Sequence, residues 1–304
     1  MTAKEIRNVP ASVHPRLLRV ARERGEEFQR LLVQYALERF LYRLGRSQYS
    51  QRFVLKGAML FQVWEGNLPR TTRDLDLLGV GDNTEASIVA AFREIWRLEE
   101  LEDGLELDSG SVVAEPIRER TNYVGLRVKC RARLGKAEIP LQVDVGFGDA
   151  VLPAAEAIDY PTLLDFPAPK VLAYPREAVV AEKTQAMIEL GLLNSRLKDY
   201  FDVSYLAGTY EFDGTRLQEA LEATLRRRDT LVPEDRTEAL GPAFATDSDK
   251  QAQWEAFQGR ADLPREDLNA VVQQVRDFVE PVLQALSKGD AFNKTWPIGG
   301  PWQN

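Results

Sequence analysis

The chain has almost none of the side chains on which many enzymes depend. Its 304 residues include one cysteine, Cys130, and one histidine, His14. A single cysteine cannot form an internal disulfide, and so few histidines and cysteines nearly exclude a His/Cys zinc site or a histidine-dependent triad. Chemistry in this protein therefore has to rest on carboxylates, lysines and arginines.

Long apolar runs and an excess of positive charge are also missing. No stretch of the sequence approaches the roughly 20 apolar residues of a membrane-spanning helix, and the N-terminus lacks the apolar core of a signal peptide. We therefore expect a cytoplasmic protein with no membrane partner. The net charge of −8 argues against a general, charge-driven nucleic-acid binder, although a local basic groove is compatible with it.

The most informative stretch of the sequence runs from Phe53 to Leu78. A short apolar run predicts a strand that reaches the small-residue step Lys56-Gly57-Ala58, and a helical pattern follows until Gly66 ends it. A glycine between a strand and a helix lets phosphate oxygens approach free backbone N–H groups and the positive end of the helix dipole. The pattern therefore predicts a phosphate-binding step at Gly57.

The same stretch ends in a pair of aspartates within Arg70-Thr71-Thr72-Arg73-Asp74-Leu75-Asp76. Because side chains alternate along a strand, Asp74 and Asp76 point one way while Leu75 points into a core. Mg²⁺ usually takes one or two carboxylates plus substrate phosphates, and two such ions clamp both oxygens of a phosphoryl or nucleotidyl displacement. Asp-x-Asp alone is more often solvated surface or a cap, but this order of features is much more specific.

Taken in order, these motifs resemble those of nucleotidyltransferase toxins of the AbiEii and MenT type, members of the polymerase-β-like superfamily. Their first motif reads as a hydrophobic residue, Gly, then Gly or Ser, a helix, and Arg-x-Thr/Ser-x-Asp-x-Asp. Ala58 departs from the Gly/Ser pattern, which removes a hydroxyl contact. The resemblance implies Mg²⁺, with Mn²⁺ as the alternative, and an NTP. It assigns metal binding to Asp74 and Asp76 and NTP binding to Gly57, Ala58, Arg70 and Thr72.

Three strand patterns follow, at residues 111–117, 123–134 and 139–145. The middle one places Arg127, Lys129, Arg131 and Arg133 on one face, which suits an RNA acceptor. A four-residue hairpin loop at 135–138 would set Asp144 opposite Lys129. We interpret Asp144 as a third metal-binding carboxylate, since polymerase-β-like folds place one on a neighbouring strand. A cross-strand ion pair between Asp144 and Lys129 is the alternative.

The second half of the chain is predicted to be helical. Prolines recur from residue 147 to 175, and we place a domain boundary there, giving domains at 1–160 and 161–304. Lys183 emerges from the apolar face of a helix at 176–190 and needs a counter-charge, which a triphosphate would supply. The resemblance extends to a following Ser-Arg-x-Lys-Asp-x-x-Asp motif. It implies that Lys183 and either Asp199 or Asp202 are catalytic, while Arg196 pairing with Asp199 is a compatible structural role.

These patterns predict an α+β protein with a polymerase-β-like nucleotidyltransferase domain, built on a mixed β-sheet, and a C-terminal helical domain. The resemblance implies the toxin half of a type IV-like toxin–antitoxin pair, with a cognate antitoxin as partner, that adds nucleotides from an NTP to the 3′ end of tRNA or another RNA. Two alternatives stay open. One is transfer of a nucleotide or phosphate to a protein, including the enzyme itself. The other is a catalytically silent module that binds an NTP or a partner.

Overall fold

The chain separates into two compact units in the computed structural model, which describes residues 9–66, 74–98, 102–117, 125–234, 237–261 and 263–304. The first unit comprises residues 1–148 and 156–173, and the second comprises 149–155 and 174–304. The sequence predicts a single boundary after residue 160, within the proline-rich crossing. Part of that crossing forms a strand of the first unit, Lys170–Ala173, and the division into domains stays a prediction.

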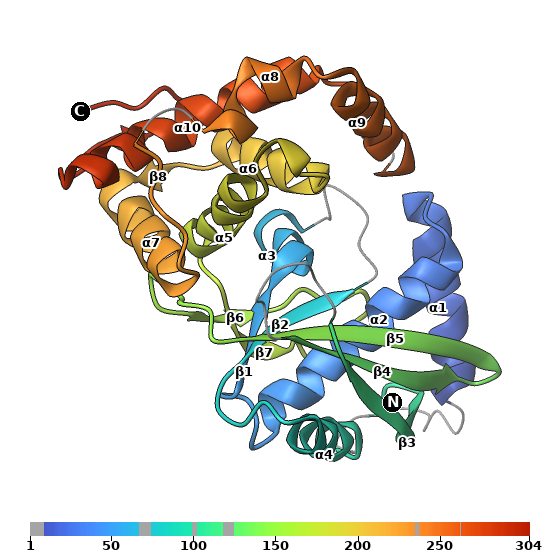
Figure 1. Cartoon of the computed structure of the whole chain (residues 1–304). Helices are drawn as coiled ribbons and strands as arrows, with labels where there is room; N and C mark the ends of the chain where they lie inside the picture. Colours follow the sequence, from blue (N-terminus) through green and yellow to red (C-terminus); the bar gives the residue numbers. More distant parts are fainter. Residues whose placement is uncertain (1–8, 67–73, 99–101, 118–124, 235–236, 262) are drawn as a thin grey trace. The chain divides into compact units, whose positions relative to one another are not determined.

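The first unit is built on a mixed β-sheet, which in the described residues has seven strands in the order β3-β4-β5-β2-β1-β7-β6 (Figure 1). Strand β2 runs parallel to β5, and β1 runs parallel to β7. The pairs β1–β2, β3–β4, β4–β5 and β6–β7 are antiparallel. The predicted α+β class with a mixed sheet is confirmed. The strands are β1 (Phe53–Lys56), β2 (Leu75–Gly79), β3 (Leu105–Pro116), β4 (Gly125–Leu134), β5 (Ala137–Phe147), β6 (Glu156–Asp159) and β7 (Lys170–Ala173).

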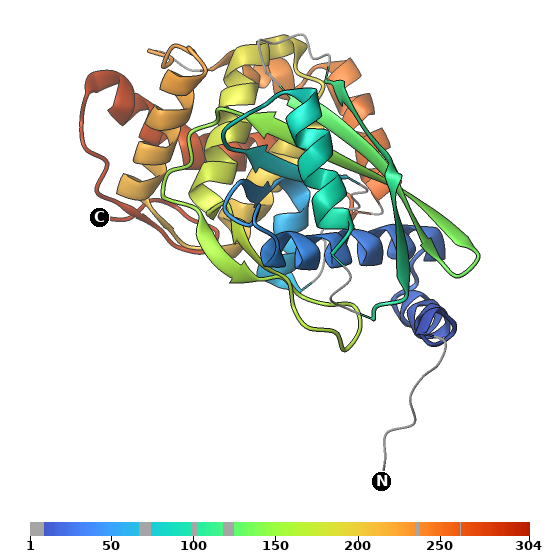
Figure 2. The same ribbon diagram turned by 90° about the horizontal axis from the view of Figure 1, so that it is seen from below.

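Helices α2 (Phe28–Arg46) and α4 (Glu85–Trp96) lie against this sheet, as the view from below shows (Figure 2). Their apolar faces meet each other, with the ring of Phe40 stacked on that of Phe92 at 5.2 Å between centroids. Alternate residues of β4 and β5, such as Val128 and Val143, are fully buried beneath them. Burial of this face fixes which side chains of the strands remain on the opposite face. Helices α1 (Val9–Arg24) and α3 (Leu60–Glu65) complete the unit.

The hairpin between β4 and β5 differs from the prediction. Its turn has two residues, Gly135 and Lys136, and Leu134 pairs with Ala137. Gly135 has a φ of +60°, which suits the first central position of a type II′ hairpin turn, where glycine is preferred. The pairing is therefore displaced by two residues from the predicted one. Because two is the period of a strand, the buried faces stay as predicted, but the cross-strand partners change.

The second unit consists mainly of helices. Helix α5 packs against α6 and α7, and α10 also packs against both. The tail after α10 packs back against that helix. The ring of Trp302 stacks on Phe278, and its indole nitrogen donates a hydrogen bond to the Phe278 carbonyl. No helix within the described ranges is both long and apolar enough to cross a bilayer. The elements are α5 (Arg176–Leu190), α6 (Leu197–Thr209), β8 (Phe212–Asp213), α7 (Gly214–Arg227), α8 (Pro242–Ala245), α9 (Ser248–Ala261), α10 (Leu268–Lys288) and β9 (Thr295–Trp296).

Candidate active site

The predicted phosphate-binding step lies where β1 ends and a short 3-10 turn, Gly57–Met59, leads into α3. Gly57 has a φ of +75°, a conformation that side-chain-bearing residues rarely adopt. A Cβ added to Gly57 would lie 2.8 Å from both the Cβ and the Cγ of Asp76, and closer still to its Oδ2. The absent side chain thus makes room for the carboxylate of Asp76. Ala58 is buried, so any contact with a phosphate would come from its backbone.

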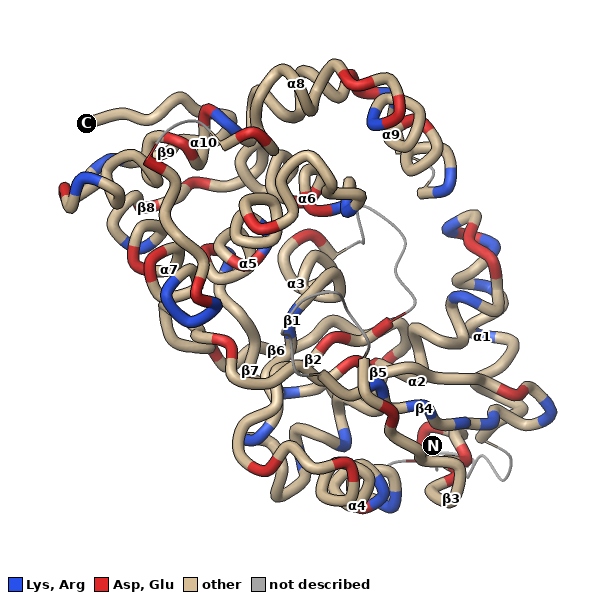
Figure 3. Tube along the Cα trace, viewed as in Figure 1, with Lys and Arg blue, Asp and Glu red and all other residues tan. Residues whose placement is uncertain are grey.

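The register of the sheet brings two of the predicted metal ligands side by side. Asp76 on β2 pairs with Asp144 on the parallel strand β5. Asp74 immediately precedes β2, and its charge acts on Arg127, the neighbour of Asp144. Figure 3 shows these acidic positions on β2 and β5 close to basic positions on β1 and β4. Residues nearly seventy positions apart in the sequence are thus neighbours on one face of the sheet.

Each of these two aspartates has a cation as its next cross-strand neighbour. Lys56 on β1 pairs with Asp76, and Arg127 on β4 pairs with Asp144. Lys56 is only 8% exposed, which is unusual for a lysine. We call Lys56, Asp76, Asp144 and Arg127 the charged row. The predicted pairing of Asp144 with Lys129 is wrong, because the shorter turn sets Gln142 opposite Lys129.

The contact between Arg127 and Asp144 is bidentate. The guanidinium Nε donates to Oδ1 at 2.9 Å and Nη2 donates to Oδ2 at 2.8 Å. These hydrogen bonds raise the pKa of Arg127 above its already high ordinary value, and the charges of Asp144 and Asp74 act in the same direction. Arg127 therefore stays positively charged at every physiological pH.

The donor set fits a hard divalent cation in part. Asp76 and Asp144 offer two neighbouring carboxylates, the number that Mg²⁺ usually takes from a protein in addition to substrate phosphates. In the part of the chain that the structure describes, no three His, Cys, Asp or Glu side chains are grouped so that they could hold a metal ion together. Asp144 is turned toward Arg127 instead. The set of three ligands, Asp74, Asp76 and Asp144, stays a prediction.

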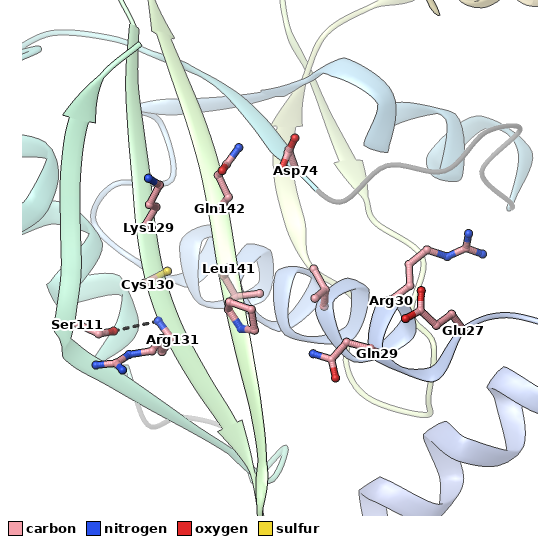
Figure 4. A pocket seen from close by; sticks show the side chains of 12 residues that line it. Glu27, Gln29, Arg30, Asp74, Ser111, Lys129, Cys130, Arg131, Leu141 and Gln142 are labelled. Carbon is pink, nitrogen blue, oxygen red and sulfur yellow. Dashed lines mark hydrogen bonds between the residues drawn. The ribbon is translucent and has the colours of Figure 1, made fainter. Parts of the chain in front are cut away.

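A groove of about 510 Å³ begins at Asp74 in the first unit (Figure 4). One wall is formed by β4 and β5, which contribute Lys129, Arg131 and Gln142. The other wall comes from the start of α2, which contributes Arg30. The groove therefore joins one of the predicted catalytic carboxylates to part of the predicted RNA-binding face.

The cations of that face have acidic partners on the adjacent strands. Glu115 pairs with Lys129, and Asp144 with Arg127. Arg131 lies 3.7 Å from Asp108, and Arg133 lies 3.4 Å from Glu138. Positive and negative side chains thus alternate across the face. An RNA bound there would have to displace exposed carboxylates, which is feasible because exposed ion pairs contribute only about 0–1 kcal/mol each.

Lys183 of the second unit lies between two buried aspartates. Its Nζ is 2.8 Å from Asp199 Oδ1 and 2.7 Å from Asp202 Oδ2, and both carboxylates are fully buried. These acids supply the counter-charge that the sequence predicts for Lys183. The predicted pair between Arg196 and Asp199 is also present, at 2.9 Å. Burial raises the pKa of Asp199, but the charges of Lys183 and Arg196 outweigh it and hold that pKa below its ordinary value.

The structure adds one residue and one contact to the predicted set and leaves two residues aside. Arg70 and Thr72 lie outside the described residues. Lys56 and the contact of Arg127 with Asp144 are absent from the sequence-based predictions. Lys56 stands within the glycine motif, and a two-residue turn at Gly135 would have placed Arg127 correctly, so both had a signal in the sequence.

Two solved structures from Helicobacter pylori share this fold. JHP933 is 16% identical to the chain, with a TM-score of 0.50. The alignment covers 86% of this chain and 94% of JHP933. A candidate nucleotidyltransferase is also 16% identical, with 87% of this chain and 99% of that one covered and a TM-score of 0.50. At this identity the likeness concerns the fold. No curated protein sequence matches the chain.

The comparison with protein families places the chain in the class of nucleotidyltransferases. The family model described as nucleotidyl transferase AbiEii toxin, type IV toxin–antitoxin system, matches residues 39–281. The chain therefore belongs to the AbiEii nucleotidyl transferase toxin family. The match spans the Gly57 step, the charged row and the Lys183 cluster.

Proposed function

We propose that the chain is a Mg²⁺-dependent enzyme that transfers nucleotides from an NTP to the 3′ end of an RNA, with tRNA as the first candidate. The observation that carries the proposal is the adjacent placement of Asp76 and Asp144, with Gly57 packed against the Asp76 carboxylate. In the transfer, a bond forms between the RNA 3′ oxygen and the α-phosphorus. The bond to the β-phosphate breaks, and pyrophosphate leaves.

The roles of individual residues follow from their chemistry. The backbone N–H groups at Gly57 and Ala58, with Arg70 and Thr72, would bind the triphosphate. The family resemblance assigns Lys183 a role toward the phosphates, and Asp199 and Asp202 hold its ammonium group in position. Asp74, Asp76 and Asp144 would hold Mg²⁺ or Mn²⁺, which when bound would supply positive charge to the phosphate oxygens. One of these carboxylates accepts the proton of the attacking hydroxyl.

The groove beside Asp74 is the proposed site of the acceptor. It leads from Asp74 past Gln142 to Lys129 and Arg131, and these cations would contact phosphates of the RNA backbone. Arg127 extends the same face of β4 toward Asp144. An acceptor lying there would bring its terminal hydroxyl to the carboxylate that begins the groove.

The biological setting follows from the family. As the toxin of a type IV toxin–antitoxin system, the protein would block growth by modifying RNA in the cytoplasm, and a cognate antitoxin would oppose it. The substrate RNA and the antitoxin are parts of the proposal. The family assignment supports them, since a toxin of such a system acts with an antitoxin partner.

The direct test is label transfer. Purified protein is incubated with Mg²⁺, each of the four NTPs labelled on the α-phosphate, and total tRNA, and the RNA is separated on a gel. We expect label on tRNA with the unaltered chain and loss by about 100-fold or more in Asp76→Asn, as for loss of a group essential in the transition state. The matched control is Asp108→Asn, which should retain activity. It removes a carboxylate of the same unit, on β3, where Asp108 pairs with Arg131 of β4.

Two results would redirect the proposal. Label on a protein band in the absence of RNA, lost in Asp76→Asn, would identify a protein as the acceptor. Equal label transfer by Asp76→Asn and the unaltered chain would refute the role of the aspartate pair. Mass spectrometry of tRNA 3′ ends after expression then identifies the nucleotide and the tRNA together.

A further inference from the structure

The charged row contains an arrangement that the proposed reaction does not require. Asp76 and Asp144 are direct neighbours on adjacent strands, where like charges repel. The row continues with a cation on either side, Lys56 next to Asp76 and Arg127 next to Asp144. The two acids are therefore balanced by two cations of the same chain before any metal ion arrives.

The pair between Arg127 and Asp144 differs from the other ion pairs of β4. Both oxygens of Asp144 accept hydrogen bonds from the guanidinium, at 2.9 and 2.8 Å, and the Asp144 side chain is 19% exposed. Arg131 and Arg133, by contrast, contact more exposed acids at 3.7 and 3.4 Å. Bidentate pairs of this kind are the stronger and more directional ones. Arg127 thus occupies the oxygens that a metal ion would need.

We propose that Arg127 is a positioning residue that competes with the divalent cation for Asp144. In the nucleotide-free enzyme the ion pair holds Asp144, and the cation binds this carboxylate well only after the guanidinium has left it. The phosphates of the NTP are the natural acceptor for the released guanidinium, because arginine binds phosphate with the same two-pronged geometry as carboxylate. This inference rests on the proposed function, since it concerns the same metal site.

The competition has a direct consequence for metal affinity. A guanidinium next to Asp144 opposes a divalent cation both by its positive charge and by engaging the ligand oxygens. Removing it leaves Asp144 with its charge and with free lone pairs. The carboxylate then resembles a metal ligand that is ready to bind. Loss of a cation on β4 should therefore strengthen metal binding, which is the opposite of what a merely structural role for Arg127 predicts.

The test is a titration of the nucleotide-free protein with Mn²⁺, in which the electron paramagnetic resonance signal of the free ion is measured at each step. In Arg127→Gln we expect Mn²⁺ to bind about tenfold more tightly or better, the factor that corresponds to a hydrogen bond to a charged group. Arg131→Gln removes the same charge from the same face of the same strand. It should leave the affinity within about twofold, since its charge is exposed and screened. Adding Asp144→Asn to Arg127→Gln should abolish the gain.

Unchanged or weaker Mn²⁺ binding in a folded Arg127→Gln variant would overturn the inference, as would an equal gain in Arg131→Gln. If Arg127→Gln does not fold, Arg127→Lys replaces it. Lysine keeps the charge but cannot form the bidentate contact, so a smaller gain is expected, and no gain would overturn the inference. Label transfer is measured separately. Label transfer by the unaltered chain, together with unchanged Mn²⁺ affinity in Arg127→Gln, rejects the competition alone. Tighter Mn²⁺ binding in Arg127→Gln, together with no label transfer by the unaltered chain, rejects the proposed function alone.

Discussion

Replacing Gly57 by alanine should disable the site while leaving the fold in place. The added Cβ would lie 2.8 Å from the Cβ and Cγ of Asp76, whereas carbon atoms in contact prefer about 3.5–4.0 Å. The aspartate side chain therefore has to retreat by about 1 Å. A displacement of about 1 Å in a catalytic group can cost about 100-fold in rate.

The backbone of Gly57 adds a second and separable cost. Its φ of +75° is strained for alanine by about 1–2 kcal/mol, whatever space surrounds it. Gly66 provides a matched control, since its φ is +71° and no atom lies within 4 Å of the position of its Cβ. Gly66→Ala thus carries the strain without the collision, and we expect the two variants to lose similar stability.

The assay compares the two variants by label transfer and by urea unfolding. We expect Gly57→Ala to lose about 100-fold in transfer and Gly66→Ala to lose less than about threefold, with unfolding free energies of the two within about 1 kcal/mol of each other. Equal activity of the two variants would refute the argument that Gly57 exists to accommodate Asp76. A much larger loss of stability in Gly57→Ala would instead show that the collision is relieved by disrupting the fold.

Three further predictions concern stability. Lys183→Met leaves Asp199 and Asp202 buried without their shared cation, so urea unfolding at neutral pH should show a loss of about 3–5 kcal/mol; the exposed Lys198→Met is the control. Burial raises the pKa of Glu38 from 4.5 to about 7 in the folded chain. The contribution of Glu38 to the stability of the fold is therefore complete below pH 4.5 and is lost as the pH rises through 7. The free energy of unfolding of the unaltered chain should therefore fall by up to about 3 kcal/mol between pH 4.5 and pH values above 7, and Glu38→Gln should remove this pH dependence. An unchanged pH dependence in Glu38→Gln would exclude Glu38 as its source. Trp302→Ala should lower stability by about 1–2 kcal/mol through loss of stacking on Phe278, as measured by thermal unfolding.

Much of the fold follows from local patterns in the sequence. The alternation of apolar and charged residues in β4 is strict, so the buried face could be predicted even though the pairing was displaced. The pairing itself depends on a single local event, the conformation of Gly135, which decides between a turn of two and a loop of four residues. Strand β7 lies between prolines in a stretch that has no alternation to read, and it forms because β1 offers it a parallel edge.

The candidate site could be predicted in part for a related reason. Motifs identify Asp74, Asp76 and Lys183, because each stands in a short pattern with its own geometry. Partners that come from other strands carry no such pattern. The ion pair between Arg127 and Asp144 depends on the register of two strands that are joined by the Gly135 turn, so an error of two residues exchanged Arg127 for Lys129.

The two units deal with clustered carboxylates in the same way. In the first, Asp76 and Asp144 are flanked by Lys56 and Arg127, and in the second, buried acids surround Lys183. In the second unit the resident cation lets the buried Asp199 stay ionised, because an unpaired buried charge is costly and would otherwise be neutralised by a proton. The pKa of Asp199, held below its ordinary value despite complete burial, follows this reasoning. In both units the resident cations hold the carboxylate oxygens, and they therefore set how much a metal ion or a phosphate gains by displacing them.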